Sequence, residues 1–124
     1  MSKKYVIVGA SGQLGRALCV MFPDAKALSR EELDISDEAQ IDAFDWSKYD
    51  VIINAAALVN ADGSETDDLR AKTWLANAYG PRNLAKIAIE QNKTLVHYSS
   101  DYVWDGREKN HQDDEVVAPL LVYG

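Results

Sequence analysis

The chain has 124 residues, of which 20 are acidic and 13 basic, so its net charge at pH 7 is -7. This acidic surplus, without a stripe of Lys or Arg, argues against nucleic acid or an anionic membrane surface as a partner. No apolar run approaches the roughly 18 residues of a membrane span, and Tyr5–Val8 is too short for a signal peptide. Cys19 is the single cysteine and cannot form an internal disulfide, which favours a cytoplasmic location.

The first part of the chain alternates strand and helix patterns. Tyr5–Val8 is a short apolar run typical of a buried parallel strand, and residues 13–21 carry apolar side chains at helical spacing. Residues 25–28 predict a second strand, and Leu33-Asp34-Ile35 predicts a very short third one. Ser36 is the expected N-cap of a helix that runs through residue 44.

The second part repeats the alternation. Residues 50–53 predict a buried strand, and Ser64 is the expected cap of a long helical region that Gly80-Pro81 should kink or interrupt. Residues 94–98 predict a further strand. Strands alternating with helices predict an α/β fold, a Rossmann-type doubly wound parallel sheet with strand order 3-2-1-4-5 that is incomplete at the C-terminus. We expect residues 1–124 to form a single NAD(P)-binding domain, the N-terminal fragment of a longer enzyme.

A glycine-rich turn, Gly9-Ala10-Ser11-Gly12-Gln13-Leu14-Gly15, joins the first strand to the first helix. Gly9 permits a tight turn, Gly12 lets the backbone approach a phosphate, and Gly15 lets the helix pack closely on the strand. The N–H groups that open the helix would face a pyrophosphate. A tight strand-to-helix turn without a ligand is the alternative interpretation, and the strand and helix context favours dinucleotide binding.

The residues after the second strand bear on the choice of dinucleotide. An acidic residue there selects NAD through the 2′-hydroxyl of the adenosine ribose, but this chain has Ser29 and Arg30. A hydroxyl and a guanidinium suit a 2′-phosphate, which favours NADP(H). Glu31 and Glu32 follow at once and could pair with Arg30, so NAD(H) stays open as a second cofactor.

Five blocks, in order along the whole chain, resemble the extended short-chain dehydrogenases, and the last two resemble the dTDP-4-dehydrorhamnose reductase family in particular. The blocks are the glycine turn, Glu-Leu-Asp-Ile-Ser-Asp (32–37), Asp-Val-Ile-Ile-Asn-Ala-Ala-Ala (50–57), Leu-Val-His-Tyr-Ser-Ser-Asp-Tyr-Val-Trp-Asp-Gly (95–106) and Ala-Pro-Leu-Leu-Val-Tyr-Gly (118–124). The glycine turn is generic, whereas the Ser-Asp-Tyr-Val-x-Asp-Gly segment is more specific.

The resemblance implies a set of cofactor-binding residues. The turn residues would line the pyrophosphate, Asp34 and Ile35 would border the adenine, and a small-residue turn would leave room for the cofactor. Asn77 matches a helix Asn found behind the active site. The full set expected at the cofactor is Gly9, Ser11, Gly12, Gln13, Leu14, Gly15, Ser29, Arg30, Asp34, Ile35, Ala55, Ala56, Ala57 and Asn77.

The resemblance also implies catalytic residues and a reaction. Ser100 and Tyr123 match the catalytic hydroxyls, and Tyr102 would contact the substrate. The implied reaction is the NAD(P)H-dependent reduction of a 4-keto sugar nucleotide, dTDP-4-dehydro-L-rhamnose, to dTDP-L-rhamnose. The family pattern Tyr-x-x-x-Lys is cut after Gly124, so we expect the 124-residue chain alone to bind dinucleotide weakly and not to turn over.

Two other functions remain open at this point. One is a non-catalytic dinucleotide-binding regulatory subunit, and the other is a sugar-nucleotide epimerase or dehydratase. No metal site is expected, because His97 and His111 share no cysteine or carboxylate cluster with ligand spacing. Homodimer formation is left open by the sequence.

Overall fold

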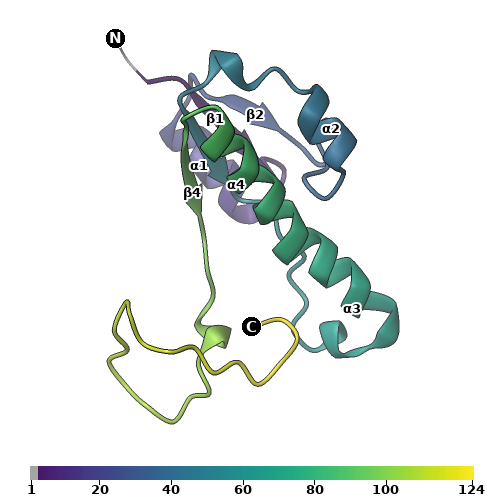
Figure 1. Ribbon diagram of the computed structural model, residues 1–124, viewed down its shortest axis with the longest axis vertical. Helices are drawn as coiled ribbons and strands as arrows, with labels where there is room; N and C mark the ends of the chain where they lie inside the picture. The colour runs from purple at the N-terminus through teal and green to yellow at the C-terminus, as the bar shows by residue number, and fades with distance from the viewer. Residues whose placement is uncertain (1–2) are drawn as a thin grey trace.

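A four-stranded parallel sheet forms the centre of the computed structural model, which describes residues 3–124 (Figure 1). Its strands are β1 (Tyr5–Val8), β2 (Lys26–Leu28), β3 (Val51–Asn54) and β4 (Thr94–His97). They lie in the order β2-β1-β3-β4, and each neighbouring pair is parallel. The expected Rossmann-type α/β class and the order of these four strands are confirmed.

The expected strand at Leu33-Asp34-Ile35 is wrong. Residues 29–37 form a turn instead, in which the Leu33 N–H donates to the Ser29 carbonyl at 3.0 Å. Leu33 and Ile35 are nevertheless buried, with 3% and 4% of their surface exposed. The alternating pattern therefore reflects two side chains that reach the core from a loop without pairing with β2, so the sheet ends at β2.

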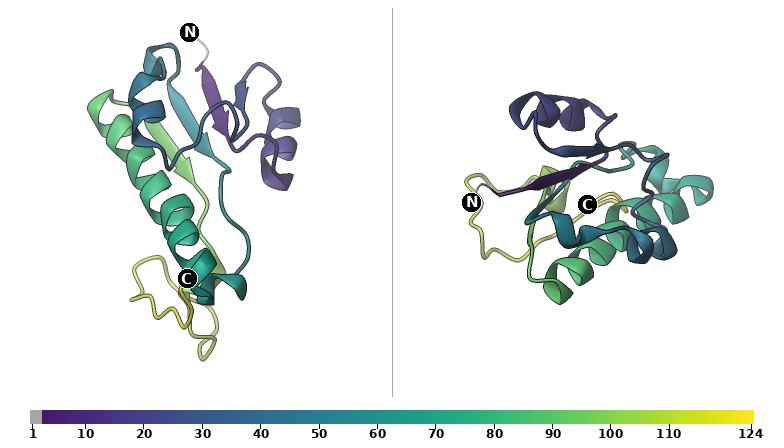
Figure 2. Two further views of the ribbon diagram at one scale, coloured as in Figure 1. Left: turned by 90° about the vertical axis from the view of Figure 1, so that its right-hand side faces the viewer. Right: turned by 90° about the horizontal axis from the view of Figure 1, so that it is seen from above.

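Helices cover both faces of the sheet. The right-hand view of Figure 2 shows α1 on one face and α2 and α4 on the other. The helices are α1 (Gln13–Met21), α2 (Glu38–Ala43), α3 (Asp67–Trp74) and α4 (Gly80–Glu90), with short 3₁₀ turns at Trp46–Lys48, Gly63–Glu65 and Asp101–Val103. The apolar central strands β1 and β3 are thus buried on both faces, whereas most residues of the edge strands β2 and β4 are exposed.

Two of the expected helix caps are corrected by the structure. Asp37, not Ser36, caps α2, because its carboxylate accepts the N–H groups of Ala39 and Gln40. Ser64 caps no helix: its buried hydroxyl donates to the Asn60 carbonyl at 2.6 Å. Both serines have nearby polar partners that compete for the side chain, which the sequence pattern did not reveal.

The expected interruption at Gly80-Pro81 takes the form of a π-helical turn, Leu75–Tyr79, directly before Gly80. The backbone stays helical through this turn, so α3 and α4 join in one continuous rod. Pro81 lies at the start of α4, and the wider π turn accommodates its missing N–H and its ring. Gly80 is needed for close packing, because a Cβ there would lie 2.7 Å from the Ile35 side chain. The rod therefore rests directly on the turn that follows β2.

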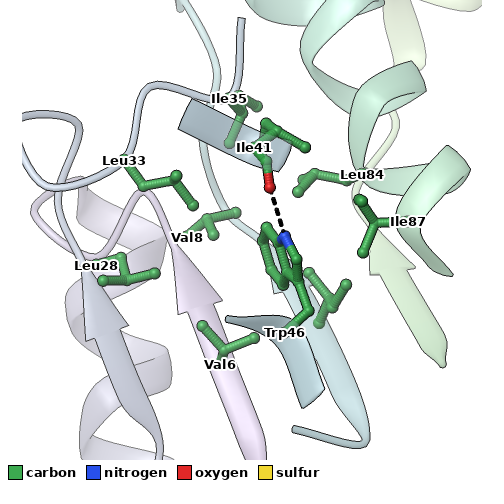
Figure 3. Packing of buried hydrophobic residues seen from close by; sticks show 10 residues of the cluster. Val6, Val8, Leu28, Leu33, Ile35, Ile41, Trp46, Leu84 and Ile87 are labelled. Carbon is green, nitrogen blue, oxygen red and sulfur yellow. Dashed lines mark hydrogen bonds between the residues drawn. The ribbon is translucent and has the colours of Figure 1, made fainter. Parts of the chain in front are cut away.

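The larger core cluster lies between the sheet and the α2 and α4 helices (Figure 3). Val6, Val8 and Ile52 point to this face, whereas Ile7 and Ile53 point to the α1 face. Trp46 is 1% exposed, and its indole N–H donates to the Ile41 carbonyl at 2.8 Å (Figure 3). This bond satisfies both polar groups in an otherwise apolar cluster.

The chain beyond β4 is largely irregular and returns to the start of α3, as the C-terminus in Figure 1 shows. The Val122 N–H donates to the Glu65 carboxylate at 2.6 Å, and the Ala118 N–H donates to the Val103 carbonyl at 2.8 Å. These bonds bring Tyr123 back toward the sheet. Across residues 3–124, no helix is both long and apolar enough to cross a membrane.

Candidate functional site

Three adjoining clefts lie at the carboxyl ends of the strands, with volumes of about 280, 550 and 150 Å³. All three are lined by Ala56 and Ala57, which follow β3. The order β2-β1-β3-β4 reverses direction between β1 and β3, and parallel α/β sheets bind ligands at such a switch point. The three clefts together are called the β1/β3 groove below.

Gly9 and Gly15 are required by the fold. Gly9 has a φ of 75°, and a Cβ there would lie 2.5 Å from the Ala56 backbone nitrogen. A Cβ on Gly15 would overlap the Gly9 carbonyl oxygen and lie 2.7 Å from the Ala10 Cα. Both glycines hold the β1–α1 turn against its neighbours, as expected, and Gly15 does so without lining the groove.

Gly12 differs from these two glycines. Its backbone, with φ of -71° and ψ of 171°, suits any residue, and a Cβ would meet only the Gly9 carbonyl at an ordinary 3.4 Å. The folded chain itself therefore does not require glycine at this position. Gly12 lines the groove, so the missing side chain leaves space there for a ligand.

The N-terminus of α1 opens toward the groove without a cap. Gly12 supplies no side-chain hydrogen bond, and the first turn of α1 contains no acidic residue. In α2, by contrast, Asp37 occupies the first N–H groups with its carboxylate. The amides of Gln13 and Leu14 consequently stay available to an anion, and the helix dipole favours negative charge there.

Arg30, Asp34 and Ile35 line the β2 end of the groove. The Arg30 Nε–H donates to the Asp34 carboxylate at 3.0 Å, so Arg30 pairs with Asp34 instead of Glu31 or Glu32. Burial opposes ionisation of Asp34, but hydrogen bonds from Ser36 and Arg30 outweigh it and hold the pKa of Asp34 below its ordinary value. The positive charge of Arg30 and the negative charge of Asp34 thus lie side by side in the groove.

Ser29 does not line the groove. Its N–H donates to the Glu32 carboxylate at 2.8 Å, and Glu32 also lies 3.8 Å from the Lys26 ammonium. Ser11 and Gly9 do line the groove beside Gly12, and Gln13 and Leu14 line it on the α1 side. Glu32, two residues after Arg30 in sequence, is thus engaged by partners of its own.

Asn54 at the end of β3 fixes the turn of small residues that follows, a role that the sequence pattern did not predict. Its Oδ1 accepts the Ala56 N–H at 3.0 Å, which leaves its Nδ2 to donate to Nδ1 of His97 at 3.0 Å. His97 must therefore carry its proton on Nε2. Partial burial lowers the pKa of His97 below its ordinary value of 6.5. A polar residue that closes a wholly buried strand was the available signal.

Asn77, from the π turn, holds the other end of this segment. Its Oδ1 accepts the Leu58 N–H at 2.8 Å, and its Nδ2 donates to the Leu58 carbonyl at 3.0 Å. The loop from Ala55 to Leu58 is therefore clamped at both ends by a side-chain amide. This clamp keeps the floor of the groove in place between its two ends.

Ser100, Tyr123 and Asn77 line the smallest cleft, at the β4 end of the groove. The Ser100 hydroxyl accepts the Tyr102 N–H at 3.2 Å, which makes it the cap of the short 3₁₀ turn that follows. Tyr102 packs edge-on against Tyr123 with ring centroids 5.4 Å apart, but lines a separate, open depression. The two expected catalytic hydroxyls share one cleft, and Tyr102 lies behind it.

No group of three or more His, Cys, Asp or Glu side chains is arranged to hold a metal ion in the part of the chain that the structure describes. The groove instead offers amide N–H groups, one guanidinium and hydroxyl groups. Such donors suit a phosphorylated organic molecule, and the absent side chain of Gly12 leaves a cradle that a Cβ would fill.

A protein-family model described as the RmlD substrate binding domain matches residues 3–124. The chain belongs to this family. The match confirms the resemblance to dTDP-4-dehydrorhamnose reductases that the sequence blocks indicated. The RmlD-family chain is 37% identical to dTDP-4-dehydrorhamnose reductase of Aggregatibacter actinomycetemcomitans, over 98% of this chain and 43% of that protein.

Two further relatives bear on the site. A crystal structure of dTDP-4-dehydrorhamnose reductase from Bacillus anthracis in complex with NADP superimposes with a TM-score of 0.89 and 28% identity, over 99% of this chain and 45% of that chain. The β subunit of methionine adenosyltransferase 2 from Xenopus laevis is 35% identical over 99% of this chain and 40% of that protein. The RmlD-family chain thus spans less than half the length of these relatives.

The difference between Gly12 and Gly15 predicts unequal costs of adding a methyl group. Gly15→Ala should lower the free energy of unfolding by about 3 kcal/mol, because its Cβ meets backbone that cannot move aside. Gly12→Ala should cost within about 1 kcal/mol, since only the cap preference changes. Urea denaturation of both variants measures this, and equal costs would contradict the assignment.

The lowered pKa of His97 predicts a pH-dependent stability. Unfolded chains protonate this histidine near pH 6.5, whereas the folded chain resists protonation, so stability should fall as the pH drops through 6.5. His97→Gln should remove this part of the pH dependence. Urea denaturation at pH 7.5 and pH 5.5 tests it, and an unchanged slope in the variant would show that His97 is not responsible.

Proposed function

We propose that this chain is the cofactor-binding, N-terminal part of a cytoplasmic NADP(H)-dependent reductase that acts on a 4-keto sugar nucleotide. The proposal combines the β1/β3 groove with the named activities of RmlD-family relatives that are more than twice as long. In this proposal residues 1–124 form one domain. The partner is a sugar nucleotide such as dTDP-4-dehydro-L-rhamnose.

The observation that carries the proposal is the uncapped start of α1 beside Gly12. Glycine there is not needed for the fold, and the amides beyond it have no acidic neighbour in the first turn. A diphosphate would satisfy both features, because it needs close approach of the backbone and several N–H donors. A structural turn alone would account for Gly9 and Gly15 but not for Gly12.

Arg30 supports NADP(H) over NAD(H). It lies in the groove at the end of β2, where the adenosine ribose of a dinucleotide is expected. Its guanidinium suits a phosphate monoester, and a protein of the same family was solved with NADP bound. Asp34 is also an acid in the groove, which keeps NADH as the second cofactor.

Ser100 and Tyr123 support a reduction at the other end of the groove. A bound reduced dinucleotide would supply the hydride for a sugar ketone. The Ser100 hydroxyl would orient the ketone oxygen by donating to it, and the phenol of Tyr123 would give that oxygen its proton. The two hydroxyls line one cleft, as they must if both are to act on the same ketone oxygen.

A non-catalytic dinucleotide-binding subunit is the second candidate function. The observation that favours it is the 35% identity to the β subunit of methionine adenosyltransferase 2 from Xenopus laevis. Such a protein would keep the uncapped α1 and Gly12 while the chemistry at Ser100 and Tyr123 became unnecessary. The two candidates therefore agree on the cofactor and differ at the hydroxyl pair.

The cofactor proposal predicts that the 124-residue chain binds NADPH and that Gly12 controls the affinity. Gly12→Ala should weaken binding about tenfold, and Gly12→Val more strongly, because each added carbon occupies the phosphate cradle. Isothermal titration calorimetry measures both. A wild-type chain that binds neither NADPH nor NADH would refute the proposal, as would full affinity in a folded Gly12→Val chain.

The hydroxyls of Ser100 and Tyr123 allow an experiment that distinguishes the two candidate functions. In the full-length protein, Tyr123→Phe should reduce turnover of the sugar ketone at least a hundredfold while NADPH binding is retained, since the phenol proton is lost but the ring remains. NADPH consumption with dTDP-4-dehydro-L-rhamnose measures turnover. A wild-type protein that binds NADPH without consuming it would favour the non-catalytic subunit.

A further inference from the structure

The guanidinium of Arg30 is held only at its Nε–H edge. Its Nε–H donates to Oδ2 of Asp34 at 3.0 Å, while 73% of its side chain is exposed. No other hydrogen bond of Arg30 is found within residues 3–124. The two terminal NH₂ groups, which form the outer edge of the guanidinium, stay available for a second acceptor.

Asp34 is itself fixed by a neighbour that lies outside the groove lining. Its Oδ1 accepts both the N–H of Ser36 at 2.9 Å and the hydroxyl of Ser36 at 2.6 Å. The Asp34 backbone N–H donates to the Gln40 side chain at 3.1 Å, which ties the turn to α2. The carboxylate therefore has one oxygen locked by Ser36 and the other oxygen directed at Arg30.

We propose that Ser36 and Asp34 are positioning residues that orient Arg30 toward a phosphorylated adenosine ribose and so set the preference for NADPH over NADH. This inference rests on the proposed cofactor function. An arginine held at Nε keeps its outer edge ready for a bidentate contact with a phosphate. It also loses less rotamer freedom on binding than an arginine that is free in solvent.

The acidic side chain of Asp34 beside Arg30 does not prevent Arg30 from binding a phosphate. The phosphate of the ribose bears more charge than a carboxylate, and Asp34 occupies only the inner edge of the guanidinium. Glu32 is engaged by Ser29 and Lys26, and Glu31 lies near Arg30 without forming an ion pair with it in residues 3–124. Arg30 therefore keeps one oriented edge for the ligand.

The test compares NADPH and NADH binding by calorimetry on the 124-residue chain at one ionic strength. Ser36→Ala removes only the hydroxyl and should raise the Kd for NADPH about three- to tenfold, with the Kd for NADH unchanged within about twofold. Ser36→Thr, which keeps the hydroxyl, should restore the wild-type ratio. Arg30→Ala should lose the preference, and adding Ser36→Ala to it should have no further effect.

Ser47→Ala is the matched control. Ser47 donates its hydroxyl to Asp45 at 2.6 Å, the same local contact, in a turn that lines none of the groove. It should change neither Kd. Equal weakening of NADPH and NADH by Ser36→Ala, or no change in either, would overturn the positioning role while leaving dinucleotide binding intact. A wild-type chain that binds neither dinucleotide would overturn the proposed function as well.

Discussion

The close approach of the β1–α1 turn to the end of β3 is the constraint on which the site depends. Gly9 takes a left-handed conformation against the Ala56 backbone, and Gly15 packs on the Gly9 carbonyl, so the turn and the helix start have one available position. That position places the first amides of α1 over the carboxyl edge of the sheet. The anion-binding character of the groove follows from this packing, since the helix has no capping side chain to neutralise it.

Two side-chain amides hold the next part of the groove, the loop after β3, in place. Asn54 and Asn77 clamp the loop after β3 at its two ends, and Asn54 also reaches across to His97 on β4. Polar groups that are held in this way keep a binding surface ordered before a ligand arrives, which reduces the entropy lost on binding. The clamped loop thus forms the middle of the groove, between Arg30 at one end and Tyr123 at the other.

Much of the fold could be predicted because apolar β-branched runs leave few alternatives. Tyr5–Val8 and the strand after residue 50 are of this kind, and the glycine spacing located the turn between β1 and α1. Leu33-Asp34-Ile35 misled the prediction because side-chain burial and strand pairing are separate properties: both apolar residues reach the core from a turn. The partner of Arg30 depends on how that turn folds, so the sequence could not choose between Asp34 and the glutamates.

The amides at the start of α1 are proposed to bind the diphosphate of the dinucleotide. Their chemical shifts test this binding most directly. In a ¹H–¹⁵N spectrum of the labelled 124-residue chain, titration with NADPH should shift the amide signals of Gln13, Leu14 and Gly15 most strongly, with Arg30 responding as well. The amides at the start of α2, which Asp37 caps, should stay unchanged. Saturable shifts confined to other parts of the chain, with the α1 amides unmoved, would contradict the account.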